Sequence, residues 1–469
     1  MNVRDTIAAT ATPIGLGGIG IIRISGEQAK SILCAIFRCD SVPGAKGVTL
    51  QGCPIVSHRF HHGYIFDPRS DEIIDEVMAV LMSAPRSYTR EDVVEIQCHG
   101  GPAVLECILS LVIDLGARTA QPGEFTQRAF LNGRIDLSQA EAVADLITAQ
   151  NRGATVLAAR QVRGEIKQTV RQFVMALNSA RAEIEALIEF PDDLDDHLDR
   201  EGLSAMLQRD VLGPITKLVH SYAKGRAVRD GYRVSITGRP NVGKSSLLNK
   251  LASAEKAIVT PIAGTTRDVI LADCIMGTLP LVLSDAAGIR GSDDPIEKIG
   301  VQRALQCAEQ ADLVLLVVSA EEGFTPDDRA ILERYSRLPG ILVINKIDLV
   351  DAVDRSELSA ETLPWPVLNV SALTGQGLKS LREAIVDKGS GTASEKFTDV
   401  LVSNIRHKKC FEEALMAVQQ AIEGLTNGIS EDMVSFDLQQ AVRSLQLITG
   451  EALDEQMLDT IFQRFCIGK

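Results

Sequence analysis

Gly238-Arg239-Pro240-Asn241-Val242-Gly243-Lys244-Ser245 fits the pattern G-x-x-x-x-G-K-[ST] of a phosphate-binding loop, or P-loop. Residues 232–237 before it alternate and favour a β-strand, and residues 246–251 after it are typical of the first turns of a helix. A strand, a glycine loop and a helix in this order direct backbone N–H groups at phosphate. The sequence therefore predicts a nucleotide site in which Lys244 reaches the β- and γ-phosphates and Ser245 ligates Mg²⁺.

A second motif indicates the base. Asn345-Lys346-Ile347-Asp348 follows the apolar run 341–344, so it stands at a predicted strand end. The Asp348 carboxylate can accept hydrogen bonds from the ring N–H and the exocyclic amine of guanine, and adenine has no such pair of donors. Ser371-Ala372-Leu373 follows another predicted strand and fits the loop that closes over the guanine carbonyl. These motifs predict GTP and not ATP as the nucleotide.

Two further segments, 264–268 and 284–288, stand between the P-loop and the base motif. Thr266 is the natural second ligand of Mg²⁺, Asp285 would hold the metal through water, and the Gly288 amide would sense the γ-phosphate. All of these motifs occur in the expected order on alternating strands and helices. The pattern predicts a Ras-like P-loop GTPase domain at residues 230–388.

The composition is that of a globular protein, with 45% hydrophobic and 23% charged residues among 469. A formal net charge of -14 argues that any contact with RNA is local or shared with a partner. Nine cysteines without a C-x-x-C pair favour a reducing compartment. The N-terminus has no signal pattern, and the longest apolar run, 313–318, is too short to span a bilayer. We expect a cytoplasmic protein without a membrane segment.

Residues 1–123 are predicted to form a separate α+β domain. Their glycine-rich loop 13–20 is not a second nucleotide site, because no Lys-Ser/Thr pair follows and the next segment favours a strand. In this domain the sequence predicts strands at 6–10, 21–25, 77–82 and 93–97, and helices at 27–37 and 103–115.

Helical periodicity dominates the rest of the chain outside the GTPase domain. Residues 124–189 contain no proline and predict long helices, and a further helix over 203–229 has a predicted kink near Gly213-Pro214. Helices resume after 389, with a loop at 423–433. The GTPase domain is therefore predicted to be inserted into one discontinuous helical domain, made of 124–229 and 389–469.

Over its whole length the chain resembles the tRNA modification GTPases called MnmE or TrmE. The resemblance is carried by the GTPase motifs and by segments at 5–9, 18–26, 87–92, 99–102, 128–133, 136–142 and 465–469. It implies an N-terminal domain that dimerises and binds 5-formyl-tetrahydrofolate. It further implies a flavin-dependent partner, MnmG or GidA, and a joint reaction that installs an aminomethyl-type group on C5 of the wobble uridine of certain tRNAs.

Matching positions then supply the remaining site residues. The resemblance places Arg23, Glu95, Arg134 and Lys469 at the folate. The family often has Lys where Arg134 stands, and this change keeps the charge but not the donor geometry. The complete predicted set of GTP-binding residues is Asn241, Val242, Gly243, Lys244, Ser245, Ser246, Thr260, Pro261, Ile262, Ala263, Gly264, Thr265, Thr266, Asp285, Ala286, Ala287, Gly288, Asn345, Lys346, Asp348, Ser371, Ala372 and Leu373.

For hydrolysis, the residue after D-x-x-G is Ile289 and not the glutamine that orients water in Ras-like GTPases. The resemblance implies that K⁺ acts where an arginine finger would, across a dimer of GTPase domains. Glu297 is implied as the catalytic residue that positions water. Ala286 departs from the family, which has threonine there. The implied K⁺ ligands are Asn241, Thr260, Ile262 and Thr265.

Other interpretations stay open from the sequence alone. A regulatory GTPase of ribosome assembly would need a basic RNA-binding domain, and a folate enzyme with a vestigial GTPase domain would need decayed motifs. Glu297 could be an acid that only stabilises a helix start. Cys466 is a candidate nucleophile or a packed thiol, and the acidic cluster 192–196 is a candidate metal site or a solvated turn.

Overall fold

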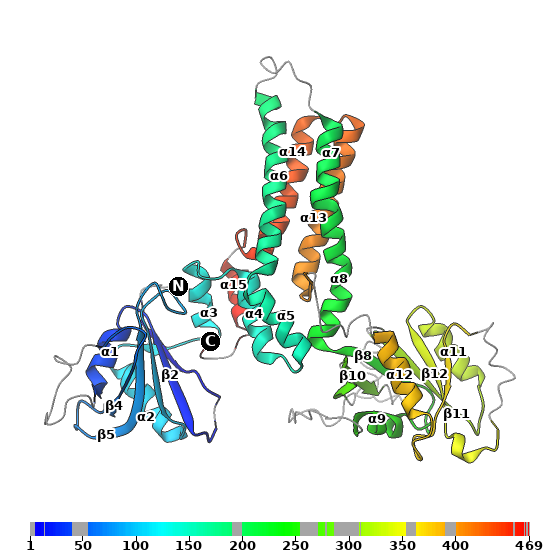
Figure 1. Ribbon diagram of the computed structural model, residues 1–469, viewed down its shortest axis with the longest axis horizontal. Coiled ribbons are helices and arrows are strands. Elements are labelled where there is room, and N and C mark those ends of the chain that lie inside the picture. Colours follow the sequence, from blue (N-terminus) through cyan, green and yellow to red (C-terminus); the bar gives the residue numbers. More distant parts are fainter. Residues whose placement is uncertain are drawn as a thin grey trace, which may run out of the picture. The chain divides into compact units, whose positions relative to one another are not determined.

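The computed structural model (Figure 1) divides into two compact units. Unit 1 comprises Met1–Ala144, Gln161–Val174 and Leu445–Lys469, and unit 2 comprises Asp145–Arg160 and Met175–Ser444. The structure describes residues 5–13, 15–39, 55–189, 199–253, 271–276, 279–285, 309, 311–352, 363–389, 400–453, 455–463, 465 and 468.

Unit 1 is built on a seven-stranded sheet with the order β3-β4-β5-β6-β2-β1-β7. Neighbouring strands are antiparallel, except for the parallel pair β1 and β7. The strands are β1 (Ile7–Thr10), β2 (Ile19–Ser25), β3 (Phe37–Cys39), β4 (Phe60–Phe66), β5 (Ile73–Met82), β6 (Val93–His99) and β7 (Arg118–Thr119).

The two faces of this sheet are covered differently. Helices α1 (Ala29–Ile36) and α2 (Pro102–Asp114) pack on one face, where Ile22, Ile24 and Ile96 are fully buried. On the other face, Phe125 of α3 (Glu124–Leu131) packs against Ile7 and Ala9 of β1. Because side chains alternate along β2, Arg23 points to this second face.

Unit 1 also contains a small helical core formed by distant parts of the sequence. Leu137 and Ala140 of α4 (Leu137–Thr148) pack with Phe462 of α15 (Glu455–Phe462) and with Phe465. The rings of Phe462 and Phe465 lie 5.3 Å apart. Phe462 and Phe465 are therefore part of the core of a unit that also contains the first residues of the sequence.

The long helices expected over 124–189 are interrupted. Gly133 and Gly164 have φ of 68° and 89°, a backbone conformation that ends a helix and favours glycine. The segment consequently forms α3, α4, α5 (Arg152–Val162) and the long α6 (Glu165–Glu189).

In the helical part of unit 2, α13 (Ile405–Asn427) packs against α7 (Arg200–Leu207) and α8 (Gly213–Asp230). The kink predicted near Gly213-Pro214 is a π-helical turn, Gln208–Leu212, directly before it. Pro214 offers no N–H and its ring crowds the carbonyl four residues earlier, so the turn widens there. The loop expected at 423–433 is shorter, because α13 continues to Asn427 and α14 (Glu431–Thr449) begins soon after Gly428.

The remainder of unit 2 is a six-stranded sheet with the order β13-β12-β11-β8-β10-β9, parallel except for β9. Helices α9 (Lys244–Ser253), α11 (Pro326–Tyr335) and α12 (Leu378–Gly389) belong to this part. The strands are β8 (Tyr232–Thr237), β9 (Leu271–Met276), β10 (Leu279–Asp285), β11 (Leu313–Ser319), β12 (Gly340–Asn345) and β13 (Val367–Asn369).

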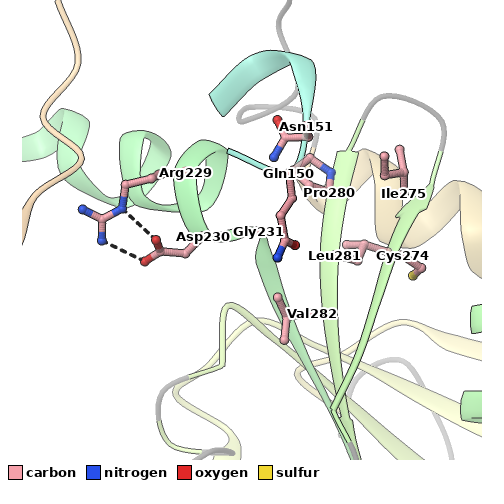
Figure 2. Close-up of a pocket in the computed structure, with 10 residues that line it drawn as sticks. All are labelled: Gln150, Asn151, Arg229, Asp230, Gly231, Cys274, Ile275, Pro280, Leu281 and Val282. Carbon is pink, nitrogen blue, oxygen red and sulfur yellow. Dashed lines mark hydrogen bonds and ion pairs between the residues drawn. The ribbon is translucent and has the colours of Figure 1, made fainter. Parts of the chain in front are cut away.

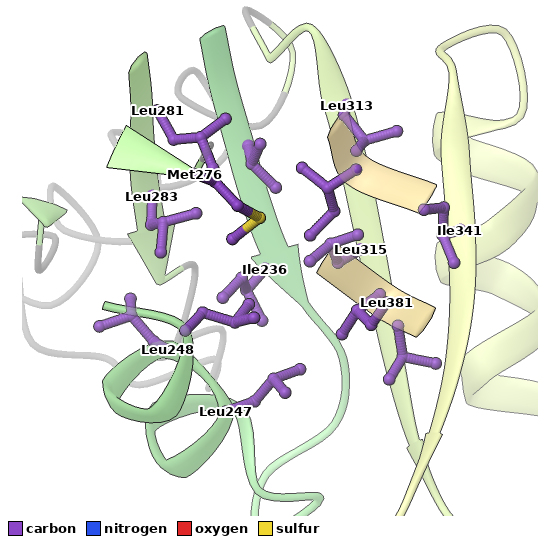
Figure 3. Close-up of a cluster of buried hydrophobic side chains, with 14 of the residues drawn as sticks. Ile236, Leu247, Leu248, Met276, Leu281, Leu283, Leu313, Leu315, Ile341 and Leu381 are labelled. Atoms are coloured by element: carbon purple, nitrogen blue, oxygen red, sulfur yellow. The ribbon is translucent and has the colours of Figure 1, made fainter. Parts of the chain in front are cut away.

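The core of this α/β part lies between the sheet and its helices. Figure 3 shows Leu247 and Leu248 of α9 and Leu381 of α12 against Ile236 and Leu315 of the central strands. Every residue of β11 is buried, as expected for a parallel strand covered on both faces. Loops at the carboxyl ends of such strands form ligand sites. The expectation of a multidomain α/β and helical protein is confirmed, and no helix of the described residues is long and apolar enough to cross a bilayer.

Candidate functional site

The P-loop follows the central strand β8 and has a backbone that only glycine permits at two points. Gly238 and Gly243 have φ of 144° and 99°. A Cβ atom would lie 2.2 Å from the Val317 carbonyl oxygen at the first position and 2.3 Å from Asn345 Nδ2 at the second. Asn241 also has a left-handed backbone, with φ of 64°. The loop therefore adopts the close turn that directs amide groups inward.

Lys244 begins helix α9 and points back over the loop. Its Nζ donates to the carbonyl oxygens of Gly238 at 2.9 Å and Arg239 at 2.7 Å. The residue is 7% exposed, so the ammonium stands at the helix N-terminus inside the cradle. This combination of helix dipole, amides and cation suits a polyphosphate.

Asn345 joins the base motif to the other two loops. Its Nδ2 donates to the Val242 carbonyl oxygen of the P-loop at 2.9 Å. Its Oδ1 accepts from the Ala372 amide at 2.9 Å. Because the side chain is 1% exposed, these bonds are shielded from water. The buried side-chain amide of Asn345 thus connects the base motif to the P-loop and to the Ser371 loop, which are far apart in the sequence.

Of the other residues in the two base loops, Asp348 and Leu373 are open to solvent. Asp348 is exposed in a short 3-10 turn, Ile347–Leu349, after the left-handed Lys346 with φ of 63°. Ser371 is buried, its Oγ accepts from the Thr374 amide at 3.0 Å, and Leu373 is 77% exposed. Ser245 and Ser246 are exposed at the start of α9. These positions leave the Asp348 carboxylate accessible to a base.

Other predicted residues of this site lie outside the described part of the chain, and Asp285 is described only as the last residue of β10. Hydroxyl and carboxylate oxygens such as those of Ser245 and Asp285 are the ligands that Mg²⁺ prefers. The residues predicted for the nucleotide site that lie outside the described part of the chain are Thr260, Pro261, Ile262, Ala263, Gly264, Thr265, Thr266, Ala286, Ala287, Gly288 and Glu297. Lys469, expected at the folate, and Cys466, the candidate nucleophile, also lie outside it.

Unit 1 has a second site, an open pocket of about 640 Å³. Arg23 on β2 and Glu95 on β6 are directly paired across the sheet. Their side chains form an ion pair with Nη2 and Oε1 2.8 Å apart. The residues that line the pocket are Arg23, Met82, Pro85, Arg86, Ser87, Tyr88, Arg90, Glu95, Arg134 and Val143. Four arginines and one carboxylate give it a positive wall that suits an anionic ligand.

The Tyr88 ring lies close to two of these arginines. The guanidinium carbon of Arg134 is 4.7 Å from the ring centroid and that of Arg23 is 5.7 Å away. Arg134 also donates to the Tyr88 carbonyl oxygen at 2.8 Å. The structure therefore brings together Arg23, Glu95 and Arg134, three of the four residues expected at the folate, and adds Tyr88.

A buried ionic network stands behind this wall. Arg128 is 5% exposed and bonds to Asp5, Glu91 and Glu124, with its Nη2 3.1 Å from Glu124 Oε1. Burial alone would raise the pKa of the Glu124 carboxyl, but hydrogen bonds from Arg118, the backbone at 121 and Arg128 outweigh it and hold the pKa below its ordinary value. The same balance lowers the pKa of Asp5.

The network reaches the pocket through the loop that carries Tyr88. Glu91 Oε2 accepts from Ser25 Oγ at 2.6 Å, and Asn132 Nδ2 donates to the Thr89 carbonyl oxygen at 2.7 Å. The Tyr88 hydroxyl lies 3.0 Å from Thr126 Oγ1. Helix α3 and the turn after it thus fix the loop 87–91.

Gly468, which follows α15 in the sequence, also contacts the pocket. Arg23 Nη1 donates to the carbonyl oxygen of Gly468 at 3.1 Å. Gly468 has φ of 89°, and a Cβ there would lie 2.4 Å from the Thr10 carbonyl oxygen, so only glycine fits. The neighbour of Lys469 is therefore in direct contact with a pocket residue.

Unit 2 contains a small cavity, shown in Figure 2. It has a volume of about 40 Å³ beside Gly231, Pro280 and Leu281, with the Arg229–Asp230 ion pair at its edge. It stands at the amino end of β8, whereas the P-loop follows the carboxyl end. It has room for little more than a water molecule and not for a nucleotide.

Sequence reasoning did not single out Tyr88, Arg86 or Arg90 as site residues. Tyr88 belongs to a segment that carries the family resemblance, and that was the available signal. Arg86 and Arg90 stand in a loop without periodicity. Only their position along the pocket wall identifies them.

Two family models match the chain: MnmE helical domain over residues 137–466 and GTP-binding protein TrmE N-terminus over residues 6–134. The tRNA modification GTPase MnmE of Geobacillus kaustophilus is 42% identical over 473 residues, which cover 100% of this chain and 100% of the relative. The protein of the same name from Geobacter sulfurreducens is 43% identical over 470 residues, with the same coverage. A crystal structure of an Era variant of Aquifex aeolicus bound to GDP and AlF4⁻ is 28% identical, covers 39% of this chain and 66% of that chain, and gives a TM-score of 0.29.

Proposed function

This chain belongs to the MnmE family of tRNA modification GTPases, and from that premise we propose that it hydrolyses GTP to drive modification of C5 of the wobble uridine in certain tRNAs. The added group is of the aminomethyl type, such as carboxymethylaminomethyl. The observation that carries the GTPase part is the buried Asn345, which joins the P-loop to the base motif and the Ser371 loop.

GTP and Mg²⁺ occupy the carboxyl edge of the six-stranded sheet in this proposal. The P-loop amides and Lys244 hold the phosphates, and Asp348 accepts from guanine. Ser245, Thr266 and, through water, Asp285 hold the metal. When bound, Mg²⁺ neutralises charge on the phosphate oxygens. Lys244 adds a positive charge next to the phosphate oxygens on which negative charge develops during hydrolysis.

K⁺ is the proposed activator of hydrolysis, across a dimer of GTPase domains. Asn241 supports this, because its exposed amide stands at the rim of the P-loop on a left-handed backbone. The family resemblance adds oxygen atoms of Thr260, Ile262 and Thr265. The cation supplies positive charge that stabilises the transferring phosphoryl group. Glu297 orients the attacking water.

Comparing K⁺ with Na⁺ tests this assignment in the full-length protein. We expect fast hydrolysis in K⁺ and slow hydrolysis in Na⁺. Asn241→Ala should bind nucleotide but lose the response to K⁺. Glu297→Ala should keep K⁺-dependent dimerisation of the GTPase domains while turnover drops on the order of 10²-fold or more. Wild-type turnover by Glu297→Ala would mean that water is held elsewhere.

The pocket of unit 1 is proposed to bind 5-formyl-tetrahydrofolate or a related folate. Its arginines suit the glutamyl carboxylates, the Tyr88 ring offers a face for stacking, and the Glu95 carboxylate suits N–H donors of a pterin. Lys469 adds a further charge in this proposal, supported by the contact of its neighbour Gly468 with Arg23.

The proposed assembly is a cytoplasmic homodimer that works with the flavoprotein MnmG, also called GidA, on tRNA. The net charge of -14 supports a shared tRNA surface, because a strongly acidic chain gains little from phosphate contacts alone. The N-terminal domain is proposed to form the dimer. A monomeric N-terminal domain in sedimentation at micromolar concentration would contradict that part.

Nucleoside analysis of tRNA from a deletion strain tests the modification itself. We expect wobble uridines to lose their aminomethyl-type groups and to regain them with the wild-type gene. Complementation with Lys244→Ala should fail, because this variant lacks the phosphate contact. Complementation with Arg23→Met should fail because the pocket loses a charged group that holds its ligand. If deletion leaves the modification intact, the proposal fails and a regulatory GTPase of ribosome assembly takes its place.

A further inference from the structure

The first half of the P-loop is tied to a helix that supplies none of the nucleotide motifs. Arg239, the second residue of the loop, donates through Nε to Asp328 Oδ1 at 3.0 Å and Oδ2 at 3.1 Å. Its Nη1 is 2.7 Å from Glu322 Oε2. The Asp328 side chain is fully buried and that of Arg239 is 19% exposed, so this ion pair is shielded from solvent.

Asp328 also belongs to the capping box of α11. Its Oδ2 accepts from the Thr325 amide at 3.1 Å and from Thr325 Oγ1 at 2.8 Å. Its own amide donates to Thr325 Oγ1 at 3.4 Å. The carboxylate is therefore held in place by the helix start before it meets Arg239, and it offers a rigid anchor.

The anchor acts on the part of the loop that holds Lys244. The ammonium is bonded to the carbonyl oxygens of Gly238 and Arg239, so its position depends on the backbone at these two residues. Asn345 fixes Val242 in the second half of the loop. Between them, Asn345 and Asp328 hold the loop at both ends.

We propose that Asp328, acting through Arg239, is a positioning residue that sets the Lys244 ammonium for the β-phosphate of guanine nucleotides. Asp328 does not touch the nucleotide. The inference rests on the proposed GTP site and extends it to a buried pair outside the GTPase motifs. The competing explanation is that Asp328 only stabilises the start of α11.

Arg239→Met, Asp328→Asn and the double variant of the full-length protein test the proposal, with GDP and GTP as probes. Asn can still accept the capping bonds but carries no charge. Each single variant should weaken GDP and GTP binding about tenfold, because a charged hydrogen-bond partner is lost. KM should rise accordingly while kcat stays within about threefold, since the contact is made before and during reaction.

Thr325→Ala is the matched control, because it removes the hydroxyl of the capping box but keeps the ion pair with Arg239 and the bond from the residue 325 amide that holds the Asp328 carboxylate. It should lower the melting temperature while nucleotide affinity stays within about twofold of wild type, since the P-loop is untouched. The double variant should bind about as weakly as either single variant, because both remove one interaction. Calorimetry gives the affinities and thermal unfolding gives the stabilities.

Three results would each overturn the inference: wild-type affinity in Arg239→Met, a loss of affinity in Thr325→Ala as large as in Asp328→Asn, or additive losses in the double variant. Arg239→Met decides the question even if Asp328→Asn does not fold, because Arg239 is not part of the cap. A wild-type protein that binds no guanine nucleotide would overturn the proposed function itself. If the wild type binds guanine nucleotides and the variants bind them with the same affinity, only this inference would be overturned.

Discussion

The nucleotide site and the arginine-lined pocket are built in opposite ways. At the nucleotide site, short contiguous motifs follow parallel strands, and the site depends on close backbone turns, as between Gly238 and Gly243. In the pocket, single side chains such as Arg23, Glu95 and Arg134 come from distant parts of the chain, and a buried ionic network supports them. The first site depends on backbone geometry and the second on paired charges.

This difference predicts different sensitivities. A site made by backbone turns should lose binding when one contact group changes but should keep its fold. A pocket supported by buried ion pairs should lose stability when one charge is removed, because the remaining charges stay buried without compensation. The following experiments test that contrast, starting from the largest expected effect.

Arg128→Met should test the contrast most strongly. Its guanidinium is 5% exposed and meets Glu124, whose side chain is 2% exposed. Removal of one partner of a buried ion pair costs about 3–5 kcal/mol. Thermal unfolding should show an early transition of unit 1, with folate binding lost and GTP binding kept. Arg69→Met removes a 67% exposed guanidinium in the same unit and should have a much smaller effect. Equal effects of the two variants would remove the distinction between the sites.

Asp348→Asn should change nucleotide choice without changing stability. We expect GTP affinity to fall on the order of 10²-fold, because two charge-assisted hydrogen bonds are weakened. Xanthosine triphosphate should gain affinity, since xanthine has a carbonyl where guanine has its amine. Calorimetry with both nucleotides and thermal unfolding check these outcomes. Equal binding of ATP and GTP by the wild-type protein would contradict the guanine assignment.

Removal of residues 466–469 should affect only the pocket. The contact between Arg23 Nη1 and the Gly468 carbonyl oxygen is lost, and one charge-assisted bond corresponds to roughly a tenfold change in affinity. Formyl-tetrahydrofolate binding should weaken by about that factor while GTP binding stays the same. The matched control, Gly428→Ala, changes a helix end in unit 2 and should leave folate affinity unaltered. Unchanged folate affinity after the truncation would exclude this segment from the site.

Acid should reveal the ionic support of unit 1. The pKa values of Glu124 and Asp5 are lowered in the folded protein, so their carboxylates stabilise it above the unfolded pKa. This stabilisation should be lost progressively as the pH falls below about 4.5, the ordinary value for glutamate. Urea unfolding of unit 1 between pH 6 and about 3 measures it. Because Arg118 contributes the largest lowering of both pKa values, a pH dependence as steep in Arg118→Met as in wild type would place its origin elsewhere.

The two regions also differ in how far the sequence predicted them. The strands before Gly238 and at Asn345 were predicted, because buried parallel strands appear in a sequence as short apolar runs next to motifs with fixed chemistry. The half-buried edge strand before Ser371 was predicted from its own short β-prone run and the motif that follows it. Strand β4 was not predicted. It contains two histidines and Gly63, whose missing Cβ would lie 2.0 Å from the Arg38 carbonyl oxygen. A close approach of that kind is set by tertiary packing and leaves no periodic signal.

For the pocket, Arg23, Glu95 and Arg134 came from the family resemblance and not from any spacing. Three side chains on β2, on β6 and after α3 become neighbours only when the sheet and α3 are in place. The Arg239–Asp328 pair escaped prediction for the same reason, since 89 residues separate its members. Local motifs can be recognised in a sequence, whereas ion pairs between residues far apart in the chain cannot.

The contact between Arg23 and Gly468 has a consequence for how the protein is made. The two residues are 445 positions apart. At roughly 5–20 residues per second, the ribosome needs about 20–90 s to pass from one to the other. The six-stranded sheet of unit 2 can emerge and fold during that interval. Leu137 and Ala140 of unit 1 stay without their packing partner Phe462 until the end of the chain has been made. The nascent chain can therefore form its nucleotide site before Gly468 is available to contact Arg23 of the arginine-lined pocket, and a ribosome stalled before residue 455 would carry a folded GTPase domain and a unit 1 whose helical core is incomplete.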